Sequence, residues 1–457
     1  MKKLIVILSC LMVIGGMLFA NGASESKTTA PAAETAAPAK DAATAMTGTN
    51  TFVTGGTPLT LWTFQELHVK FYTTMADAWN KEHPDKPINL TVTTGDSAAV
   101  HTKLLVAMQS GTGAPDICDI EIGHYGTFLA GNYLLPLNDV VDSYSKDVVM
   151  SRIKMYGDKK GNWYGIDFHV GASVAYYNMD IMNAAGIDPK TIVTWDDYYN
   201  AGLEVLKKTG KPMCAVEVRD LFLPQMMLLE KDVQYVDASG KPQIDTPEHV
   251  EVINFIKKML DAGICVVAPG GGFHTEEWYG FFDKGGVASL CMPLWYMGRF
   301  TDYMPDLKGK MGIYEIPVWK KGDTRCVLQG GTGTSITTQS KKPALAKEFL
   351  AYAKLSDTGN RYIWNVLGFD PIRTSLWTDK SVTNDPNNKF LKFFKTNPFD
   401  ILNDVGADLT APDISGAYAA TYSVLVSTTY ENVFEAQKDK DTGKVLKDEQ
   451  ASVIYDI

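Results

Sequence analysis

The chain has 457 residues, 45% of them hydrophobic, and a formal net charge of -10 at pH 7. The acidic balance extends over the whole chain and argues against nucleic acid or an anionic membrane as a partner, since both repel negative charge. The roughly 400 residues that follow the N-terminal segments exceed what one hydrophobic core usually supports, so two domains or lobes are expected.

The first 20 residues predict an export signal. Lys2 and Lys3 precede an apolar stretch over residues 4–19, and small residues follow at Ala20 and over 21–23. The stretch is shorter than the ~20 residues of a membrane span and is interrupted by two glycines. Residues 1–20 are therefore expected to be a signal peptide rather than a membrane anchor.

Cys10 could mark a bacterial lipidation site, because it follows Leu8-Ser9. Processing there would leave the apolar residues 11–20 on the product and would make the hydrophobic part of the signal implausibly short. We therefore expect a soluble periplasmic protein with a cleaved signal peptide, not a lipoprotein.

Residues 24–57 are rich in Ala, Thr, Ser, Gly and Pro and contain almost no large apolar side chain before Phe52. Such a composition cannot bury enough surface to fold. A flexible linker is therefore expected over 21–57, with the folded part beginning near residue 58.

The cysteines predict neither a disulfide framework nor a zinc site. Apart from Cys10 there are five, an odd number, and they are widely spaced and mostly in apolar runs: Cys118, Cys214, Cys265, Cys291 and Cys326. Buried free thiols fit this pattern best, and no CxxC pair is present. We expect no metal and no cofactor.

The first half of the chain alternates strand and helix patterns. Strands are expected over 59–64, 88–93 and 116–122, and helices over 67–79, 99–109 and 125–131. In the first helix Leu67, Phe71, Met75 and Trp79 recur every four residues, as one apolar stripe does. The β-α-β-α-β order predicts a mainly parallel sheet covered on both faces.

A second α/β unit follows. A hairpin is expected around 157–166, a strand over 170–177, and helices that begin at Thr194, at Thr246-Pro247 and at 340. A long C-terminal helix is expected from near Pro412 to beyond Tyr430. Two successive α/β units with a returning C-terminal region predict two lobes around a cleft.

An aromatic-rich segment, 278–300, follows the pattern of a strand with a ligand site at its end. A short apolar run over 287–291 precedes Trp295 and Tyr296, and ligands sit at strand ends in open α/β sheets. The alternative is that both rings are ordinary core residues, which the segment alone favours. Gly285-Gly286 is interpreted as a structural turn.

Two groups place histidine near carboxylates, but neither has metal-ligand spacing: His274 with Glu276 and Glu277, and Asp119 with Glu121 and His124. His124 could instead bond a ligand hydroxyl. The Asp439-x-Asp441-x-Gly443 run departs from a calcium loop and is interpreted as a surface turn.

The glycines at 330, 331 and 333 do not form a P-loop, because no Lys-Ser/Thr pair follows them. They indicate a tight segment where backbone or ligand approaches closely. The enzyme hypothesis that survives is a secreted glycosidase, which needs two carboxylates across a cleft; Glu66, Asp119, Glu121 and Glu276 could supply them.

Several segments together resemble a known family. They are GTGAPDICDIEIGHYGTFLAGNYLLPLND (111–139), GNWYGIDFHVGASVAYYNMDIMNAAGID (161–188), TWDDY (194–198), FFDKGGVASLCMPLW, GGTGTSITTQSKKPALAKEFLAY and GFDPIR (368–373). In this order and spacing the chain resembles a family 1 extracellular solute-binding protein, the sugar-capturing component of an ABC importer. LWTFQELHVKFY and PGGGFHTEEWYGFF resemble arabinose- and related saccharide-binding members.

The resemblance implies a two-lobed periplasmic-binding fold of type II whose hinged cleft closes on one saccharide. The first lobe would comprise 58–168 and 328–380, and the second 169–327 and 381–457. It also implies a monomer without catalytic residues that delivers its sugar to the transmembrane permease subunits. A secreted glycosidase and a scaffold or adhesin with a vestigial cleft are the alternatives.

The family's binding positions map onto residues that suit a sugar, which has apolar faces and a rim of hydroxyls. They are Gln65, Glu66, His68, Asp119, Glu121, His124, Phe168, His169, Trp295, Tyr296, Gly331, Thr332, Arg373, Tyr418 and Tyr422. Trp295 would be the stacking platform, with core packing an equal alternative for Tyr296. Arg373 would offer a fork of donors, and the carboxylates would offer acceptors.

Overall fold

A computed structural model describes residues 46–453. The predicted signal peptide and residues 21–45 of the predicted linker lie outside this range. Within it, no helix is both long enough and apolar enough to cross a membrane.

The first half of the chain builds a five-stranded sheet in the order β1-β3-β2-β4-β10. Its strands are β1 (Met46–Thr49), β2 (Thr57–Thr63), β3 (Ile88–Thr94), β4 (Ile117–Glu121) and β10 (Thr332–Ile336). The central strand β2 runs parallel to β3 and β4, as predicted, with Leu61 opposite Val92. The edge strands β1 and β10 are antiparallel to their neighbours, so the sheet is mixed.

The edge strand β1 corrects the predicted linker over residues 46–49. It pairs with β3 through backbone hydrogen bonds, which a composition without large apolar residues does not exclude. Gly48 lies against Val69 of α1 so closely that a Cβ atom would collide with that side chain. Glycine therefore lets this strand approach the helix.

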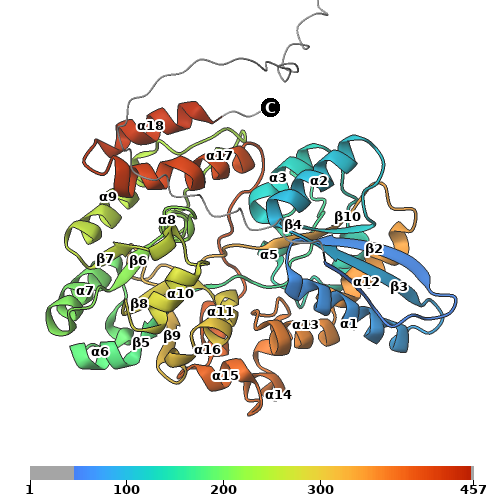
Figure 1. The fold of residues 1–457 in the computed structure, drawn as a ribbon, viewed down its shortest axis with the longest axis horizontal. Coiled ribbons are helices and arrows are strands. Elements are labelled where there is room, and N and C mark those ends of the chain that lie inside the picture. The colour runs from blue at the N-terminus through green and yellow to red at the C-terminus, as the bar shows by residue number, and fades with distance from the viewer. Residues whose placement is uncertain (1–45, 454–457) are drawn as a thin grey trace, which may run out of the picture. The chain divides into compact units, whose positions relative to one another are not determined.

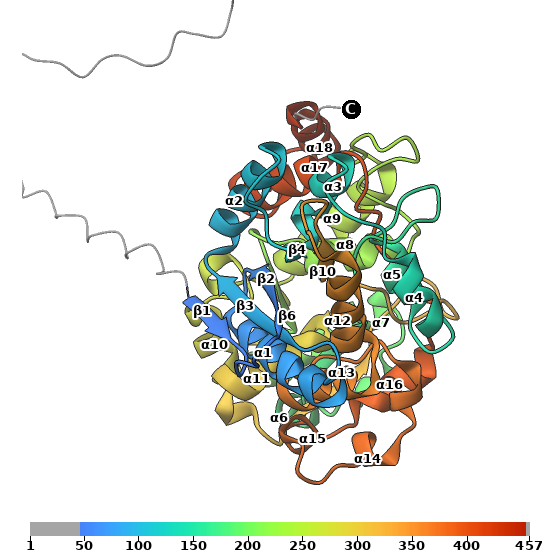
Figure 2. The ribbon, with the colours of Figure 1, turned by 90° about the vertical axis from the view of Figure 1, so that its right-hand side faces the viewer.

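Helices cover both faces of the sheet. They are α1 (Glu66–Glu82), α2 (Ser97–Gln109), α3 (Ile122–Ala130), α12 (Pro343–Leu355) and α13 (Asp357–Tyr362). In Figure 1, α2 and α3 lie on one side of the strands and α1 and α12 on the other, and Figure 2 shows the same layers after a quarter turn. The predicted stripe of α1 is confirmed, since Phe71, Met75 and Trp79 are buried.

The second group of strands forms two small sheets. One has the order β8-β5-β9 and is antiparallel; the other pairs β6 and β7 in parallel. The strands are β5 (Ser173–Asn178), β6 (Cys214–Val216), β7 (Cys265–Val267), β8 (Ser289–Pro293) and β9 (Met311–Glu315). The Ser289 amide donates to the Met213 carbonyl, which sets β8 beside the start of β6.

The main helices around these strands are α6 (Met179–Ala185), α7 (Trp195–Thr209), α8 (Phe222–Leu229), α9 (Pro247–Asp261), α10 (Glu276–Asp283) and α11 (Met297–Tyr303). The predicted capping box is confirmed: Thr194 and Asp197 bond each other's backbone at the start of α7. Shorter helices connect the elements: α4 (Asn138–Val141), α5 (Met150–Lys154), α14 (Lys380–Thr383), α15 (Lys389–Phe393) and α16 (Pro398–Val405).

The C-terminal helix begins later than predicted. α17 (Tyr418–Val424) starts six residues after Pro412 and continues into a π-helical turn, and α18 (Thr442–Ser452) follows. Before α17 the chain crosses Gly240, whose carbonyl accepts a hydrogen bond from the Ala417 amide. Gly416 has φ +57 there and leaves no room for a Cβ atom, so the helix cannot begin earlier.

The five cysteines of the described residues are buried and free, as predicted. Three crossover segments join the first sheet to the second group of strands: 166–173, 327–332 and 367–373. They bond one another, since the Gln329 amide donates to the Gly171 carbonyl and the Val170 amide to the Asp370 carbonyl. Ile166, Phe168 and Ala172 are fully buried, so the crossovers are part of the core.

Candidate functional site

The candidate site lies at strand carboxyl ends. In the first sheet the parallel strands β2, β3 and β4 end at one edge, where Gln65, Glu66 and Glu121 follow or close them. In the second group, Glu217 follows β6 and Trp295 follows β8, which runs beside β6. Such edges are where open α/β sheets bind ligands.

Trp295 is the half-buried aromatic residue at the edge of the second group. Its Nε1 donates to the Gln329 carbonyl at 3.3 Å, which ties the indole to a crossover segment. His274 lies nearly parallel to it, with 5.7 Å between ring centroids and 13° between planes, and Phe222 lies 5.5 Å away. The indole thus sits in a partly open aromatic cluster.

Tyr296 is a core residue. Its ring is fully buried, its hydroxyl donates to the Phe273 carbonyl at 2.5 Å, and it accepts a hydrogen bond from Trp278 Nε1 at 3.1 Å. The core alternative that the sequence left open therefore describes Tyr296 correctly, and the ring does not face the site.

Glu121 and Tyr422 come together at the start of α3. The Glu121 carboxylate accepts the Gly123 amide at 2.9 Å, and a Cβ atom at Gly123 would lie 2.9 Å from the Tyr422 ring. Burial, reinforced by the charge of Asp220, raises the pKa of Glu121 to about 8. Asp220 is also the largest cause of the raised pKa of Tyr422, so groups from β4, the β6 end and α17 converge.

A histidine pair supports this edge. The rings of His101 and His124 stack with centroids 4.3 Å apart and 23° between planes. His101 Nε2 accepts the Glu121 amide at 3.0 Å, and Nδ1 therefore carries the proton that it donates to the Ser97 carbonyl at 2.7 Å. Burial lowers the pKa of His101 to about 4, so the ring is neutral at pH 7.

Glu217 is a site residue that the sequence reasoning missed. It is 2% exposed; one carboxyl oxygen accepts the Phe273 amide at 2.7 Å, while the other has no hydrogen-bond partner among residues 46–453. Burial raises the pKa of Glu217 well above its ordinary value. Buried polar atoms normally have partners, so this unpartnered oxygen makes Glu217 a candidate site residue. Its place directly after a short apolar strand was the signal that could have identified it.

Three predicted site residues instead form an internal network of the first sheet: His68, Asp119 and Phe168. Asp119 is fully buried and accepts from Tyr72 at 2.7 Å and from Thr334 at 2.6 Å, and His68 Nδ1 lies 3.0 Å from its carboxylate. His68 packs on Phe168, with ring centroids 4.0 Å apart. These side chains join α1, β4 and β10, and the structure does not present them to a ligand.

The electrostatics of Asp119 suit this internal role. Burial alone would raise the pKa of Asp119, but the hydrogen bond with His68 and the charge of Lys354 hold it below its ordinary value. Lys354 is itself fully buried, and burial lowers its pKa to about 7. A carboxylate with its hydrogen-bonding capacity used in this way has little left for a sugar.

A second buried network lies under the crossovers. Arg152 and Asp167 are fully buried 2.9 Å apart, and Asp167 also accepts from Tyr156 at 2.5 Å and from the Thr332 amide at 3.2 Å. Arg152 donates to the Gly330 carbonyl at 2.5 Å. His169 packs near this pair and is 6% exposed.

The predicted glycine segment crosses this network. Gly331 has φ +141, and a Cβ atom there would collide with Arg152, Asp167 and Tyr156. A Cβ atom at Gly330 would lie 2.9 Å from Trp295 Nε1. The close backbone approach predicted for this segment is therefore present, and it places the segment beside the Trp295 indole.

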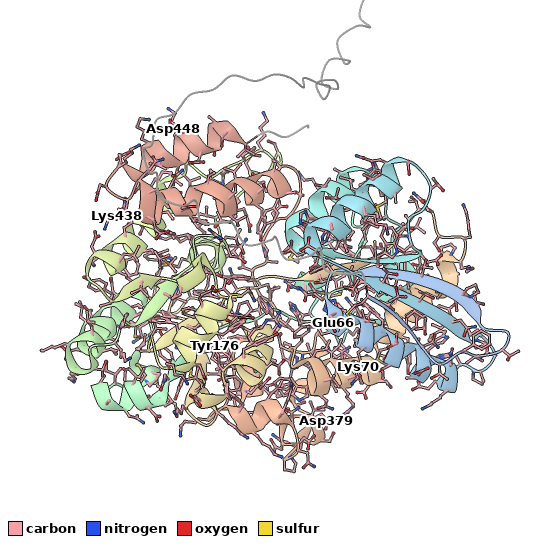
Figure 3. All side chains as sticks on the ribbon, viewed as in Figure 1. Glu66, Lys70, Tyr176, Asp379, Lys438 and Asp448 are labelled. Carbon is pink, nitrogen blue, oxygen red and sulfur yellow. The ribbon has the colours of Figure 1, made fainter. Side chains whose placement is uncertain are left out.

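Two further predicted site residues, Arg373 and Tyr418, are bonded to other parts of the chain. Arg373 pairs with Asp147 at 2.5 Å and donates to the Leu355 carbonyl at 2.8 Å, so its fork binds other parts of the chain. Tyr418 is 1% exposed and accepts from Gln225 at 3.1 Å. By contrast Gln65 is half-buried, and Figure 3 shows Glu66 at the end of α1 that points toward α10 and α11.

Two surface cavities of the described chain are lined by residues other than those of the candidate site. A surface cavity of about 490 Å³ lies between α7 and α9 and is lined by Trp195, Phe255 and Trp319 among others. A second, of about 340 Å³, is lined by residues between Thr383 and Asn397. Within residues 46–453, no group of three or more His, Cys, Asp and Glu side chains could hold a metal ion.

Comparisons with known proteins identify the family of the chain. The family model of the bacterial extracellular solute-binding proteins matches residues 66–359. An arabinooligosaccharide-binding protein of Bacillus subtilis (strain 168) is 44% identical over 356 residues, 77% of this chain and 81% of that protein. An arabinooligosaccharide-binding protein of Halalkalibacterium halodurans is 41% identical over 403 residues, 88% of this chain and 90% of that protein.

Solved structures share the fold. An ABC-transporter-associated binding protein from B. animalis subsp. lactis, in complex with beta-1,6-galactobiose, has a TM-score of 0.70 and 18% identity over 87% of this chain and 97% of its own. The sugar-binding protein MalE of Xanthomonas citri has a TM-score of 0.71 and 16% identity over 87% of this chain and 96% of its own. The chain therefore belongs to the bacterial extracellular solute-binding proteins and has their two-lobed α/β fold.

Proposed function

We propose that this protein is the substrate-binding component of an ABC importer that captures an arabino-oligosaccharide between its lobes and delivers it to the permease. Two relatives that are 41% and 44% identical over most of the chain are named for binding arabinooligosaccharides. Ligand specificity depends on the side chains that line the pocket, and those of the candidate site suit a saccharide.

The observation that carries the proposal is the pairing of an open indole with an unpartnered buried carboxyl. Trp295 offers a flat apolar ring, and Glu217 offers an oxygen with no partner in the described residues. A sugar has apolar faces that stack on aromatic rings and hydroxyls that bond acceptors. Glu121, Asp220, His124 and Tyr422 would bond the hydroxyl rim, with Gln65 and Glu66 completing it from α1.

The lobe boundaries proposed are those that the sequence predicted, 58–168 with 328–380 and 169–327 with 381–457. The membership of β10 in the first sheet supports the assignment of residues after 328 to the first lobe. The crossovers over 166–173, 327–332 and 367–373 would then be the hinge. Closure would bring Glu121 and Trp295 onto one ligand.

We propose that the protein binds its saccharide without cleaving it. Of the four carboxylates considered for a glycosidase, Asp119 is engaged internally and Glu121 caps α3. Glu66 and Glu276 are exposed in the first turns of α1 and α10. A hydrolase needs two carboxyl groups flanking the scissile bond, one of them as a proton donor.

The proposal extends to partners and place. The protein would act as an exported monomer after signal cleavage, in the periplasm and without a lipid anchor. Its partners would be the saccharide and the transmembrane permease subunits, and it would not bind nucleic acid. Membership of an extracellular solute-binding family supports export.

Calorimetry with arabinose and arabino-oligosaccharides, together with product analysis of the same mixtures, tests the proposal. We expect one binding site and no released sugar. Trp295→Ala should weaken binding by about 1–3 kcal/mol, as truncation of a stacked aromatic anchor does. The matched control is Trp319→Ala, because Trp319 is a half-buried tryptophan that lines the cavity between α7 and α9. This variant should bind normally.

Sustained release of sugar would support the glycosidase instead. Binding that is equally strong in the wild type and in Trp295→Ala would show that the cleft indole is not the platform. A complete lack of saccharide binding would favour a scaffold with a vestigial cleft.

A further inference from the structure

The outer side of α11 continues the line that Trp295 begins. Trp295 lies in the 3-10 turn Leu294–Tyr296 that leads into α11, and Arg299 and Tyr303 follow it at four-residue spacing. Within α11, Arg299 and Tyr303 are neighbours on one helix face. The opposite side of this helix is core, since Met297 and Phe300 are fully buried. Trp295 and Arg299 are half-buried and Tyr303 is 51% exposed, so accessibility grows along the line.

The neighbouring segment supplies a matching row of rings. His274, just before α10, lies nearly parallel to Trp295, and Tyr279 within α10 stacks on Tyr303 with centroids 4.6 Å apart and 4° between planes. Tyr279 is 8% exposed and lies beneath its partner. The buried tyrosine therefore supports the exposed one as a rigid flat surface.

Arg299 stands between the two stacked pairs. Within residues 46–453 it makes no ion pair, and its Nε is buried without a hydrogen-bond partner. Nearby charges are already paired: Asp302 binds Lys389 at 3.1 Å, and Lys284 binds Asp306 at 2.6 Å. A guanidinium has five donors in a fixed fork, and this one is uncommitted.

We infer that Arg299 and the stacked pair Tyr279–Tyr303 form an outer saccharide subsite that continues the Trp295 platform. The inference rests on the proposed function and adds the length of the ligand to it. The first sugar unit would stack on Trp295, while later units would lie along α11, with the Tyr303 ring beneath an apolar sugar face and Arg299 donating to hydroxyls. A single sugar would not reach these side chains.

This geometry also gives the ligand a direction. Four residues of an α-helix rise about 6 Å, so Arg299 and Tyr303, following Trp295 in steps of four, provide separate contacts for successive units of a chain. The subsite therefore favours an oligosaccharide over its monomer.

Calorimetry with arabinose, arabinobiose and arabinotriose on the full mature chain tests the inference. The wild type should bind more tightly as the sugar lengthens. Tyr303→Ala should weaken arabinotriose binding about tenfold and leave arabinose binding within about twofold, the loss expected for one stacked contact. Arg299→Lys keeps the charge but removes the fork and should act in the same direction.

Phe52→Ala is the matched control, because Phe52 is a 77% exposed aromatic residue that precedes β2 and lies outside the proposed site. It should leave the affinity for all three sugars unchanged. Melting temperatures of Tyr303→Ala and Phe52→Ala should stay close to the wild type, since both side chains are exposed.

The outcomes separate the subsite from the proposed function. Equal wild-type affinity for all three sugars, or an equal loss for all three in Tyr303→Ala, would overturn the outer subsite and leave saccharide capture intact. Absence of binding to any of the sugars would overturn the proposed function and the subsite with it.

Discussion

At the scale of single residues, two side chains that are adjacent in the sequence can have different burial and different partners in the structure. Trp295 and Tyr296 are adjacent, yet Trp295 is half-buried beside His274 and Tyr296 is fully buried against Trp278. The sequence identified the strand end and the aromatic pair. It could not decide between the two rings, because that depends on distant partners such as the Phe273 carbonyl.

The same limit applies to charged residues. Asp119 and Glu217 both follow apolar runs, and only Asp119 was predicted as a site residue; in the structure Asp119 is fully bonded within the first sheet, whereas one Glu217 oxygen has no partner among residues 46–453. Asp119 meets His68 and Tyr72 of α1 and Thr334 of β10, which lie far from it in the sequence. Such long-range pairs leave no pattern in one sequence, so the internal use of a carboxylate cannot be predicted from spacing alone.

Glu121 provides a pH-dependent prediction at this scale. Its pKa is raised to about 8 in the folded protein, first by burial and also by the charge of Asp220. The folded state therefore keeps a proton that the unfolded chain loses near pH 4.5, and the stability contributed by that proton is full below that pH and is lost as pH rises through about 8. Glutamine mimics the protonated form and can still accept the Gly123 amide.

We predict that Glu121→Gln matches the wild type in free energy of unfolding near pH 5. At pH 9 it should be more stable by on the order of 3–5 kcal/mol, because only the wild type must then bury a charge and a pKa change of one corresponds to about 1.4 kcal/mol. Urea unfolding at a series of pH values measures this. A difference that stays constant from pH 5 to pH 9 would show that Glu121 titrates normally.

At the scale of elements, the apolar periodicity of the sequence predicted those helices and strands whose position depends on side-chain burial. The stripe of α1, the central parallel strands and the capping box of α7 all follow from local patterns. The edge strand β1 and the start of α17 were missed for a common reason. Both depend on backbone contacts, with β3 and with Gly240, to which side-chain patterns contribute nothing.

The crossover before β10 supplies a prediction about an element. Gly331 has φ +141 and faces the buried Arg152–Asp167 pair, whereas Gly111 has φ +75 with open space around it. Both positions strain an alanine, but only Gly331→Ala also forces atoms into a packed network. Gly331→Ala should lower the free energy of unfolding by about 1–3 kcal/mol more than Gly111→Ala does, the usual cost of overpacking.

Denaturant unfolding of the two glycine variants measures this difference. Equal losses of stability would mean that the backbone conformation alone matters at Gly331. In that case the crossover could shift away from Arg152 at little cost, and the packed hinge proposed here would be wrong.

At the scale of the whole molecule, length and the order of elements were enough to predict two α/β lobes, which the family and the shared fold confirm. The prediction of a site was less complete. A strand end pointed to Trp295, and the family resemblance supplied Glu121 and the binding role of the glycine segment, while the contacts of Glu217, Asp220 and His101 depend on how separate elements meet. Function was thus predictable at the level of ligand class, and the detailed contacts required the structure.

The most direct test of the central claim is a crystal structure of the full mature chain grown with arabinotriose. We predict sugar density with one unit stacked on Trp295 and its hydroxyls within hydrogen-bond distance of Glu217 or Asp220, enclosed by residues of both lobes. Density on the outer cavity between α7 and α9, with the Trp295 face empty, would contradict the account.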